Sequence, residues 1–106
     1  MGVSVNAACE YAGKTQLAGS RVLVKREFEN TFLAAKRNKD LRKIKSVMQT
    51  LIEEKPLAVK FLDHPLKGNY TDCRECHIEP DWLLIYTIQN NKIIFVRTGS
   101  HSDLFK

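Results

Sequence analysis

The feature that most constrains this chain is a pair of apolar runs separated by two asparagines. The first run, Trp82–Ile88, is rich in aromatic and β-branched residues, and a second run follows at Ile93–Val96. Such residues favour strands, and Asn90-Asn91 suits the left-handed positions of a tight hairpin turn. The spacing therefore predicts an antiparallel β-hairpin near the C-terminus, around which the other elements must pack.

Two amphipathic helices are predicted upstream of this hairpin. Apolar residues at helical spacing indicate a first helix over roughly Glu27–Arg37, which Asn38 interrupts. Asp40 can cap a second helix, and Pro56 closes it. The apolar face of the second helix carries Leu41, Ile44, Met48, Leu51 and Ile52. We expect the two helices to form a short antiparallel hairpin on one side of the sheet.

Three further short strands complete the expected order of elements. Arg21–Lys25 contains a β-prone run. Pro65 and Gly68 punctuate a loop that includes another short strand, and Cys73–Ile78 forms the last one before the turn Glu79-Pro80-Asp81. The order is β-α-α-β-β-β-β, which is an α+β domain with antiparallel pairing at its C-terminal side.

The length of 106 residues suits one domain. Residues 1–20 are small and mixed and have no clear period, so we expect a poorly ordered N-terminal extension, with the organised domain over 21–106. No apolar run approaches the roughly 18 residues of a membrane span. The N-terminus also lacks the basic region of a signal peptide.

Positive charge is concentrated in one segment. The chain has 17 basic and 12 acidic residues, a formal net charge of +5. Six of the cations lie within ten positions, opposed there only by Asp40: Lys36, Arg37, Lys39, Arg42, Lys43 and Lys45. Such a cluster attracts nucleic acid, but an ordinary solvated helix face has the same composition, and charge alone leaves both readings open.

The three cysteines suggest cofactor sites that we do not expect to form. Cys9, Cys73 and Cys76 are no disulfide framework, which indicates a reduced, cytosolic chain. Residues 73–77 match the C-x-x-C-H haem motif, which requires export and a second axial ligand. A zinc site from Cys73, Cys76, His77 and His64 lacks the second paired motif of such sites. Two half-buried structural cysteines are the simpler interpretation, and no cofactor is expected.

The histidines carry a more specific signal. His64, His77 and His101 all follow residue 60, each beside a turn or chain break, with Glu79 and Asp81 nearby in sequence. Such a set can ligate a metal or act as acid and base groups. Cleavage of RNA by its own 2′-hydroxyl needs a base, an acid and cations for the phosphorane charge.

Cationic and aromatic residues near the histidines are candidates for RNA contact. Arg97 can hold a phosphate through two parallel hydrogen bonds. Trp82, Tyr86 and Phe105 have faces on which a base can stack. Core packing explains Trp82 equally well, and it is the favoured interpretation for Tyr86.

Three ordered stretches resemble the YafQ branch of the RelE/ParE toxin superfamily. They are Asp63-His64-Pro65-Leu66-Lys67-Gly68, the run from Cys73 to Tyr86, and the run from Arg97 to Phe105. The likeness covers roughly residues 22–105. It implies two N-terminal helices packed on a twisted, mainly antiparallel sheet, as in microbial ribonucleases.

The resemblance also implies a function and partners. Such toxins enter the ribosomal A site, where ribosomal RNA surrounds them, and cut mRNA in the bacterial cytoplasm. A cognate antitoxin blocks them, and operator DNA is contacted only through the toxin–antitoxin complex. The six clustered cations are then expected to hold ribosomal RNA phosphates.

Site residues follow from the same resemblance. His64, His77, Asp81 and His101 stand where this branch places its catalytic set, and Trp82 and Phe105 at positions tied to the active site and tail. We expect Asp81 or His64 to act as general base and His101 as general acid or shared proton shuttle. His77 and Arg97 are expected to stabilise phosphate charge, without a metal.

Other classes remain open at this stage. Members of the superfamily that poison DNA gyrase act by binding protein, and a non-catalytic DNA-binding module or a metal-dependent enzyme is also compatible with the residues. The ribonuclease interpretation makes one spatial prediction: the imidazoles converge with the Asp81 carboxylate around one phosphate-sized hollow.

Overall fold

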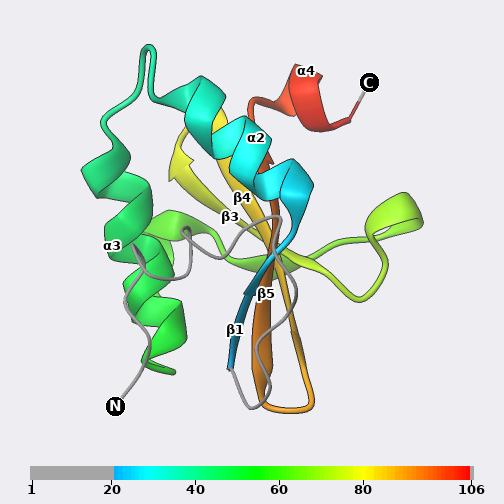
Figure 1. The fold of residues 1–106 in the computed structure, drawn as a ribbon. Helices are drawn as coiled ribbons and strands as arrows, with labels where there is room; N and C mark the ends of the chain where they lie inside the picture. The colour runs from blue at the N-terminus through cyan, green and yellow to red at the C-terminus, as the bar shows by residue number, and fades with distance from the viewer. Residues whose placement is uncertain (1–20, 106) are drawn as a thin grey trace.

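A five-stranded mixed sheet forms the centre of the fold (Figure 1). The computed structural model describes residues 21–105, so the predicted extension over 1–20, with Cys9, lies outside the described residues. The strands are β1 (Val22–Val24), β2 (His64–Pro65), β3 (Arg74–Glu79), β4 (Trp82–Gln89) and β5 (Lys92–Gly99). Their spatial order is β1-β5-β4-β3-β2. β1 runs parallel to β5 and the other neighbours are antiparallel, which confirms the expected α+β class.

The predicted C-terminal hairpin is confirmed, but its second strand is longer than expected. Asn90 and Asn91 have φ values of 51° and 64°, as the tight turn requires. β5 continues past Val96 to Gly99 because its last residues pair with the start of β4, where Leu83 lies opposite Gly99. That pairing depends on a partner strand, so the polar composition of residues 97–99 did not reveal it.

The two predicted helices form, but they do not form the expected antiparallel hairpin. α2 (Arg26–Ala35) packs on β5, whereas α3 (Leu41–Ile52) packs on β3 (Figure 1). Phe28 of α2 illustrates the reason, because its ring lies 5.7 Å from that of Phe95 on β5. Both helices bury their apolar residues in the one large core that covers one face of the sheet. Asp40 caps α3 as predicted, accepting from the backbone N–H of Arg42.

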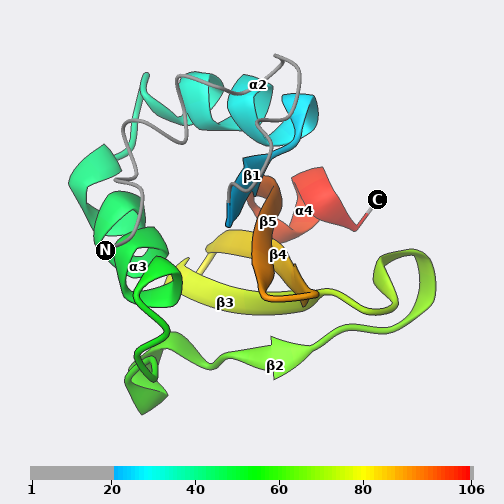
Figure 2. The same ribbon diagram turned by 60° about the horizontal axis from the view of Figure 1, so that its bottom comes forward.

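The two faces of the sheet are covered differently (Figure 2). Trp82, Leu84 and Tyr86 of β4 point to the large core beneath α2 and α3. Leu83 and Ile85 point the other way, into a smaller core that Leu104 closes. Leu104 belongs to a short helix that the sequence did not predict, α4 (His101–Leu104).

The smaller core leaves part of its sheet face free for polar side chains. Residues directly opposite in an antiparallel pair share a face. Glu75 lies opposite Ile85 and His77 opposite Leu83, so both polar residues stand on the face away from α2 and α3. Two 3₁₀ turns, η1 (Val59–Phe61) and η2 (Gly68–Tyr70), flank β2 in the chain. None of the helices within 21–105 has the length and apolar character to span a bilayer.

Candidate active site

The three histidines form a row across three elements, as the sequence predicted. The ring centroid of His77 on β3 lies 6.1 Å from that of His64 on β2 and 5.6 Å from that of His101 on α4. His77 is therefore the middle member, and its side chain is the most buried of the three, with 17% exposed against 46% and 52%. Residues far apart in sequence thus present their imidazoles to one place.

A buried carboxylate that the sequence reasoning missed joins two of these rings. Oε2 of Glu75 lies 3.0 Å from Nε2 of His64 and 3.5 Å from Nε2 of His77, and the side chain is only 5% exposed. Its other oxygen, Oε1, has no hydrogen-bond partner among the described residues. Burying a carboxylate with one oxygen unpaired lowers the stability of the fold, so its presence calls for a functional explanation. The sequence feature that could have identified Glu75 is its position two residues before His77, which places both side chains on one face of the strand.

Asp81 holds the third imidazole. Its Oδ1 accepts the backbone N–H of His101 at 2.9 Å and lies 2.7 Å from Nδ1 of the same residue. These contacts, the backbone one first, hold the pKa of Asp81 below its ordinary value. Because Nδ1 is engaged, Nε2 of His101 is the nitrogen left for a substrate.

The start of α4 is itself fixed locally. Ser100 and Asp103 form a capping box, in which each side chain accepts the other residue's backbone N–H. Asp81 belongs to the β3–β4 turn, so its contact with His101 ties that turn to α4. The position of the His101 ring therefore depends on two separate segments of the chain.

Arg97 and Phe105 lie at the border of the row. Arg97 is paired with Ile85, which in turn is paired with Glu75, so the three share one sheet face. Its guanidinium donates to the Tyr70 hydroxyl at 3.4 Å. The Phe105 ring is 44% exposed and its centroid lies 6.5 Å from that of His101. Both predicted contacts thus remain compatible with RNA binding.

The predicted role of Trp82 in base stacking is wrong. Its side chain is 1% exposed on the helix side of the sheet, and its indole N–H donates to Oγ1 of Thr98 at 3.0 Å. A ring that is closed on all sides cannot receive a base. Tyr86 is also in the core, as favoured, and its hydroxyl donates to Asp63.

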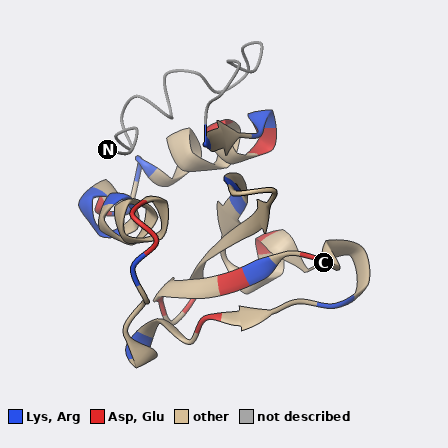
Figure 3. Ribbon diagram, turned by 90° about the horizontal axis from the view of Figure 1, so that it is seen from below, with Lys and Arg blue, Asp and Glu red and all other residues tan. Residues whose placement is uncertain are grey.

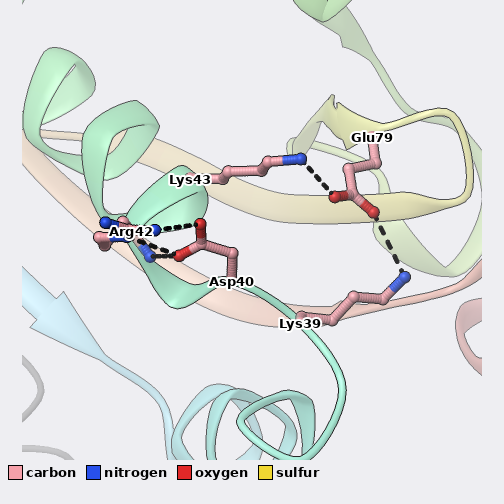
Figure 4. Close-up of polar contacts among 5 residues, drawn as sticks. All are labelled: Lys39, Asp40, Arg42, Lys43 and Glu79. Carbon is pink, nitrogen blue, oxygen red and sulfur yellow. Dashed lines mark hydrogen bonds and ion pairs between the residues drawn. The ribbon is translucent and has the colours of Figure 1, made fainter.

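The six clustered cations divide into two groups. Nζ of Lys39 and of Lys43 lie 3.4 Å and 2.8 Å from the Glu79 carboxylate, and Arg42 pairs with Asp40 at 3.0 Å (Figure 4). Within 21–105, the other three have no acidic partner: Lys36, Arg37 and Lys45. Figure 3 shows that α3, with its basic residues, lies to one side of the strands β2 and β3.

The zinc site considered from the sequence does not form. Cys76 lies in the core beneath the helices, where burial raises the pKa of its thiol to about 12, and Cys73 belongs to the opposite face. A fully buried Cys76 is equally unsuited to haem attachment. His64 and His77 do come together, but with Glu75, and one ligand atom from each of these three lies within 4.8 Å of the others.

Known proteins share this architecture. Residues 21–106 match the family described as "Bacterial toxin of type II toxin-antitoxin system, YafQ". The chain is 46% identical to the mRNA interferase toxin YafQ of Escherichia coli K12 over 74 residues, which are 69% of this chain and 80% of that protein.

Solved structures agree with the family match. The E. coli DinJ–YafQ complex aligns with a TM-score of 0.75 at 38% identity, over 80% of this chain and 97% of that chain. A copper-bound mutant toxin from Helicobacter pylori aligns with a TM-score of 0.74 at 37% identity, over 80% and 98% respectively. The shared sheet and helices are those of a RelE-like fold. The chain therefore belongs to the YafQ family of bacterial toxins of type II toxin–antitoxin systems.

Proposed function

We propose that this toxin is an endoribonuclease that cuts mRNA in the ribosomal A site without a metal. The observation that carries the proposal is the convergence of three imidazoles with Glu75 and Asp81, which come from β2, β3, the β3–β4 turn and α4. The name of its E. coli relative, an mRNA interferase, supports the same class of reaction.

The geometry suggests how the protons move. The 2′-oxygen attacks the adjacent phosphorus while its proton passes to the His64–Glu75 pair. Nε2 of His101 gives a proton to the departing 5′-oxygen, which leaves a 2′,3′-cyclic phosphate and a 5′-hydroxyl. Of the earlier candidates for the base, Asp81 is occupied by His101 and its pKa is lowered. His64 acts through Glu75, because its Nδ1 donates to the Leu62 carbonyl and its Nε2 lies against Oε2 of Glu75, which leaves Oε1 to receive the proton. His77 and Arg97 stabilise the phosphorane charge.

A metal would compete with this reaction rather than support it. His64, Glu75 and His77 have the donor types of a transition-metal site, and the unpartnered Oε1 of Glu75 leaves a ligand position available. A relative is named as copper-bound. Because such a metal takes nitrogens that the proposed proton transfers use, we expect cleavage to persist in excess chelator and to fall when Cu²⁺ is added.

The partners proposed for this chain follow from the same function. They are mRNA and ribosomal RNA in the cytoplasm, and a cognate antitoxin that contacts operator DNA as part of the complex. The E. coli relative is found in a complex with DinJ. No membrane partner is proposed.

His101→Ala tests the proposal directly. Loss of the general acid is expected to reduce cleavage of a translated message by about 10²–10⁴-fold. Primer extension measures cleavage, and circular dichroism checks the fold. Ser102→Ala, one residue along α4, is the matched control and should cleave normally.

Two results would contradict the proposal. One is full cleavage by the His101→Ala variant. The other is an induced DNA damage response in cells whose translation remains intact, which would indicate gyrase poisoning instead.

A further inference from the structure

We propose that the hollow beside the histidine row binds the nucleoside next to the cleaved phosphate. This inference rests on the ribonuclease function proposed above and adds the place where the RNA strand continues. The hollow has a volume of about 720 Å³ and lies between α3, η1 and the end of β3. That volume is within the roughly 300–1,000 Å³ of small-molecule sites.

The hollow adjoins the row of imidazoles at one residue. His77, the middle member of the row, is also part of its wall. The neighbouring wall residue, Leu62, reaches the row through its backbone, since its carbonyl oxygen accepts a hydrogen bond from Nδ1 of His64 at 2.6 Å. A nucleotide whose phosphate meets the histidines therefore places one of its neighbours at this opening.

The lining suits a base. Phe61, Leu62, Ile78 and Pro80 supply apolar surface. Leu62 is 57% exposed and has a φ of 50°, a left-handed conformation that leucine seldom adopts. The turn thus directs an apolar side chain toward solvent at the hollow while directing the carbonyl toward His64.

The rim suits the phosphates on either side of that base. Of the three cations there, Arg42 and Lys43 already pair with Asp40 and Glu79, and Lys60 has no carboxylate partner among the described residues. Nζ of Lys60 lies 5.2 Å from the centroid of Phe61, at the edge of the apolar surface. Cations around an apolar floor are the usual means of binding single-stranded RNA.

The edge of β3 adds hydrogen-bonding groups. β2 pairs only with Arg74 and Glu75, so from Cys76 onward this side of β3 has no strand neighbour among the described residues. Residues 77–80 of the same segment line the hollow. Free backbone N–H and C=O groups at such an edge can pair with the polar edge of a base.

The experiment uses the full chain and a four-nucleotide RNA with 2′-deoxyribose at its second position, which prevents cleavage. Fluorescence anisotropy gives the affinity, and NMR amide shifts show where the RNA lies. Leu62→Asn removes the apolar side chain yet suits the left-handed backbone. We expect it to weaken binding roughly fivefold or more, with the natural protein showing amide shifts at residues 60–62 and 77–79.

Val59→Asn is the matched control, because Val59 is 89% exposed on the same turn but does not line the hollow. It should bind like the natural protein. Lys60→Gln should weaken binding about two- to threefold and reduce its salt dependence.

The outcomes separate this inference from the proposed function. Equal affinities for Leu62→Asn and the natural protein, with His101→Ala still unable to cut, would reject the hollow and leave the ribonuclease standing. Loss of antitoxin binding with unchanged RNA binding would assign the hollow to a protein partner and also reject the inference. A natural protein that neither binds nor cuts RNA would overturn both.

Discussion

Asp81 shows how one exposed carboxylate can determine the placement of a catalytic group. It lies in a turn, yet it holds both the backbone N–H and the ring of His101, twenty positions away. The two hydrogen bonds from His101 favour the ionised form of Asp81 and so lower its pKa. His101 in turn presents only Nε2 to a substrate.

Replacing this carboxylate should impair cleavage without unfolding the protein. Asp81→Asn offers a neutral, weaker acceptor, so the His101 ring loses its fixed orientation and its charge partner. We expect a loss of at least roughly tenfold in the initial cleavage rate at neutral pH. Gel analysis of product against time measures that rate.

Asp72→Asn is the control for the chemical change itself. Asp72 also stands in a loop, with a φ of 75° that asparagine tolerates. It should cleave at the natural rate. Equal rates for the Asp81 and Asp72 variants would show that His101 does not depend on Asp81.

Glu75 marks the limit of residue-by-residue prediction. Its spacing from His77 predicts a shared strand face, but a charged residue in a strand normally faces water. Only the pairing of β2 with β3 places His64 over it and buries it. The histidines, Asp81 and Arg97 could be named from the sequence, whereas this carboxylate could not.

At the scale of elements, one carboxylate links α3 to the end of β3. Glu79 accepts from Lys43 on α3 and from Lys39 just before it (Figure 4). The Lys43 hydrogen bond is the main reason that the pKa of Glu79 lies below its ordinary 4.5. The ionised form is therefore favoured by folding.

This link predicts a pH-dependent contribution to stability. A carboxyl group with a lowered folded-state pKa stabilises the fold above its unfolded pKa, here 4.5, and the contribution disappears as pH falls through the lowered value. Glu79→Gln should therefore unfold at lower urea concentration than the natural protein at neutral pH. The two midpoints should converge as the pH falls below the lowered pKa of Glu79.

A variant lacking both lysines supplies the control. In the Lys39→Gln/Lys43→Gln background, Glu79→Gln should shift the urea midpoint far less, because the partners are already absent. A shift that is the same in both backgrounds, or that persists in acid, would disprove the link.

Element boundaries were predictable where local chemistry decides them. Asp40 caps α3, and Asn90 and Asn91 turn the hairpin. The arrangement of the two helices was not predictable in this way, because it depends on which strands each one packs against, β5 for α2 and β3 for α3. α4 escaped prediction because four residues are too few to show a helical period and because Leu104 is held by the smaller core.

For the molecule as a whole, the distribution of positive charge predicts how it meets a large polyanion. Of six clustered cations, half have carboxylate partners in the fold. A cation already paired with a carboxylate neutralises a phosphate less effectively, so fewer of the counterions bound to the RNA are released. The unpaired cations should therefore dominate ribosome binding.

Two triple variants with the same change in net charge test this expectation. One replaces the unpaired residues with glutamine: Lys36, Arg37 and Lys45. The other replaces the paired ones: Lys39, Arg42 and Lys43. Ribosome co-sedimentation over a range of KCl concentrations should show the larger drop in salt dependence for the unpaired set, approaching roughly one unit of log–log slope for each phosphate that the variant no longer neutralises. Equal slopes would show that the carboxylate partners do not matter.

The sequence by itself determined the local elements, the hairpin turn and the cap of α3, because each depends on neighbours within a few positions. The tertiary structure alone decided which strand face the helices cover. That choice buries Trp82, leaves Phe105 at the surface and sets Glu75 between two imidazoles. Strand alternation sends adjacent residues to opposite faces, but only the packing of distant segments determines which face becomes core and which becomes site.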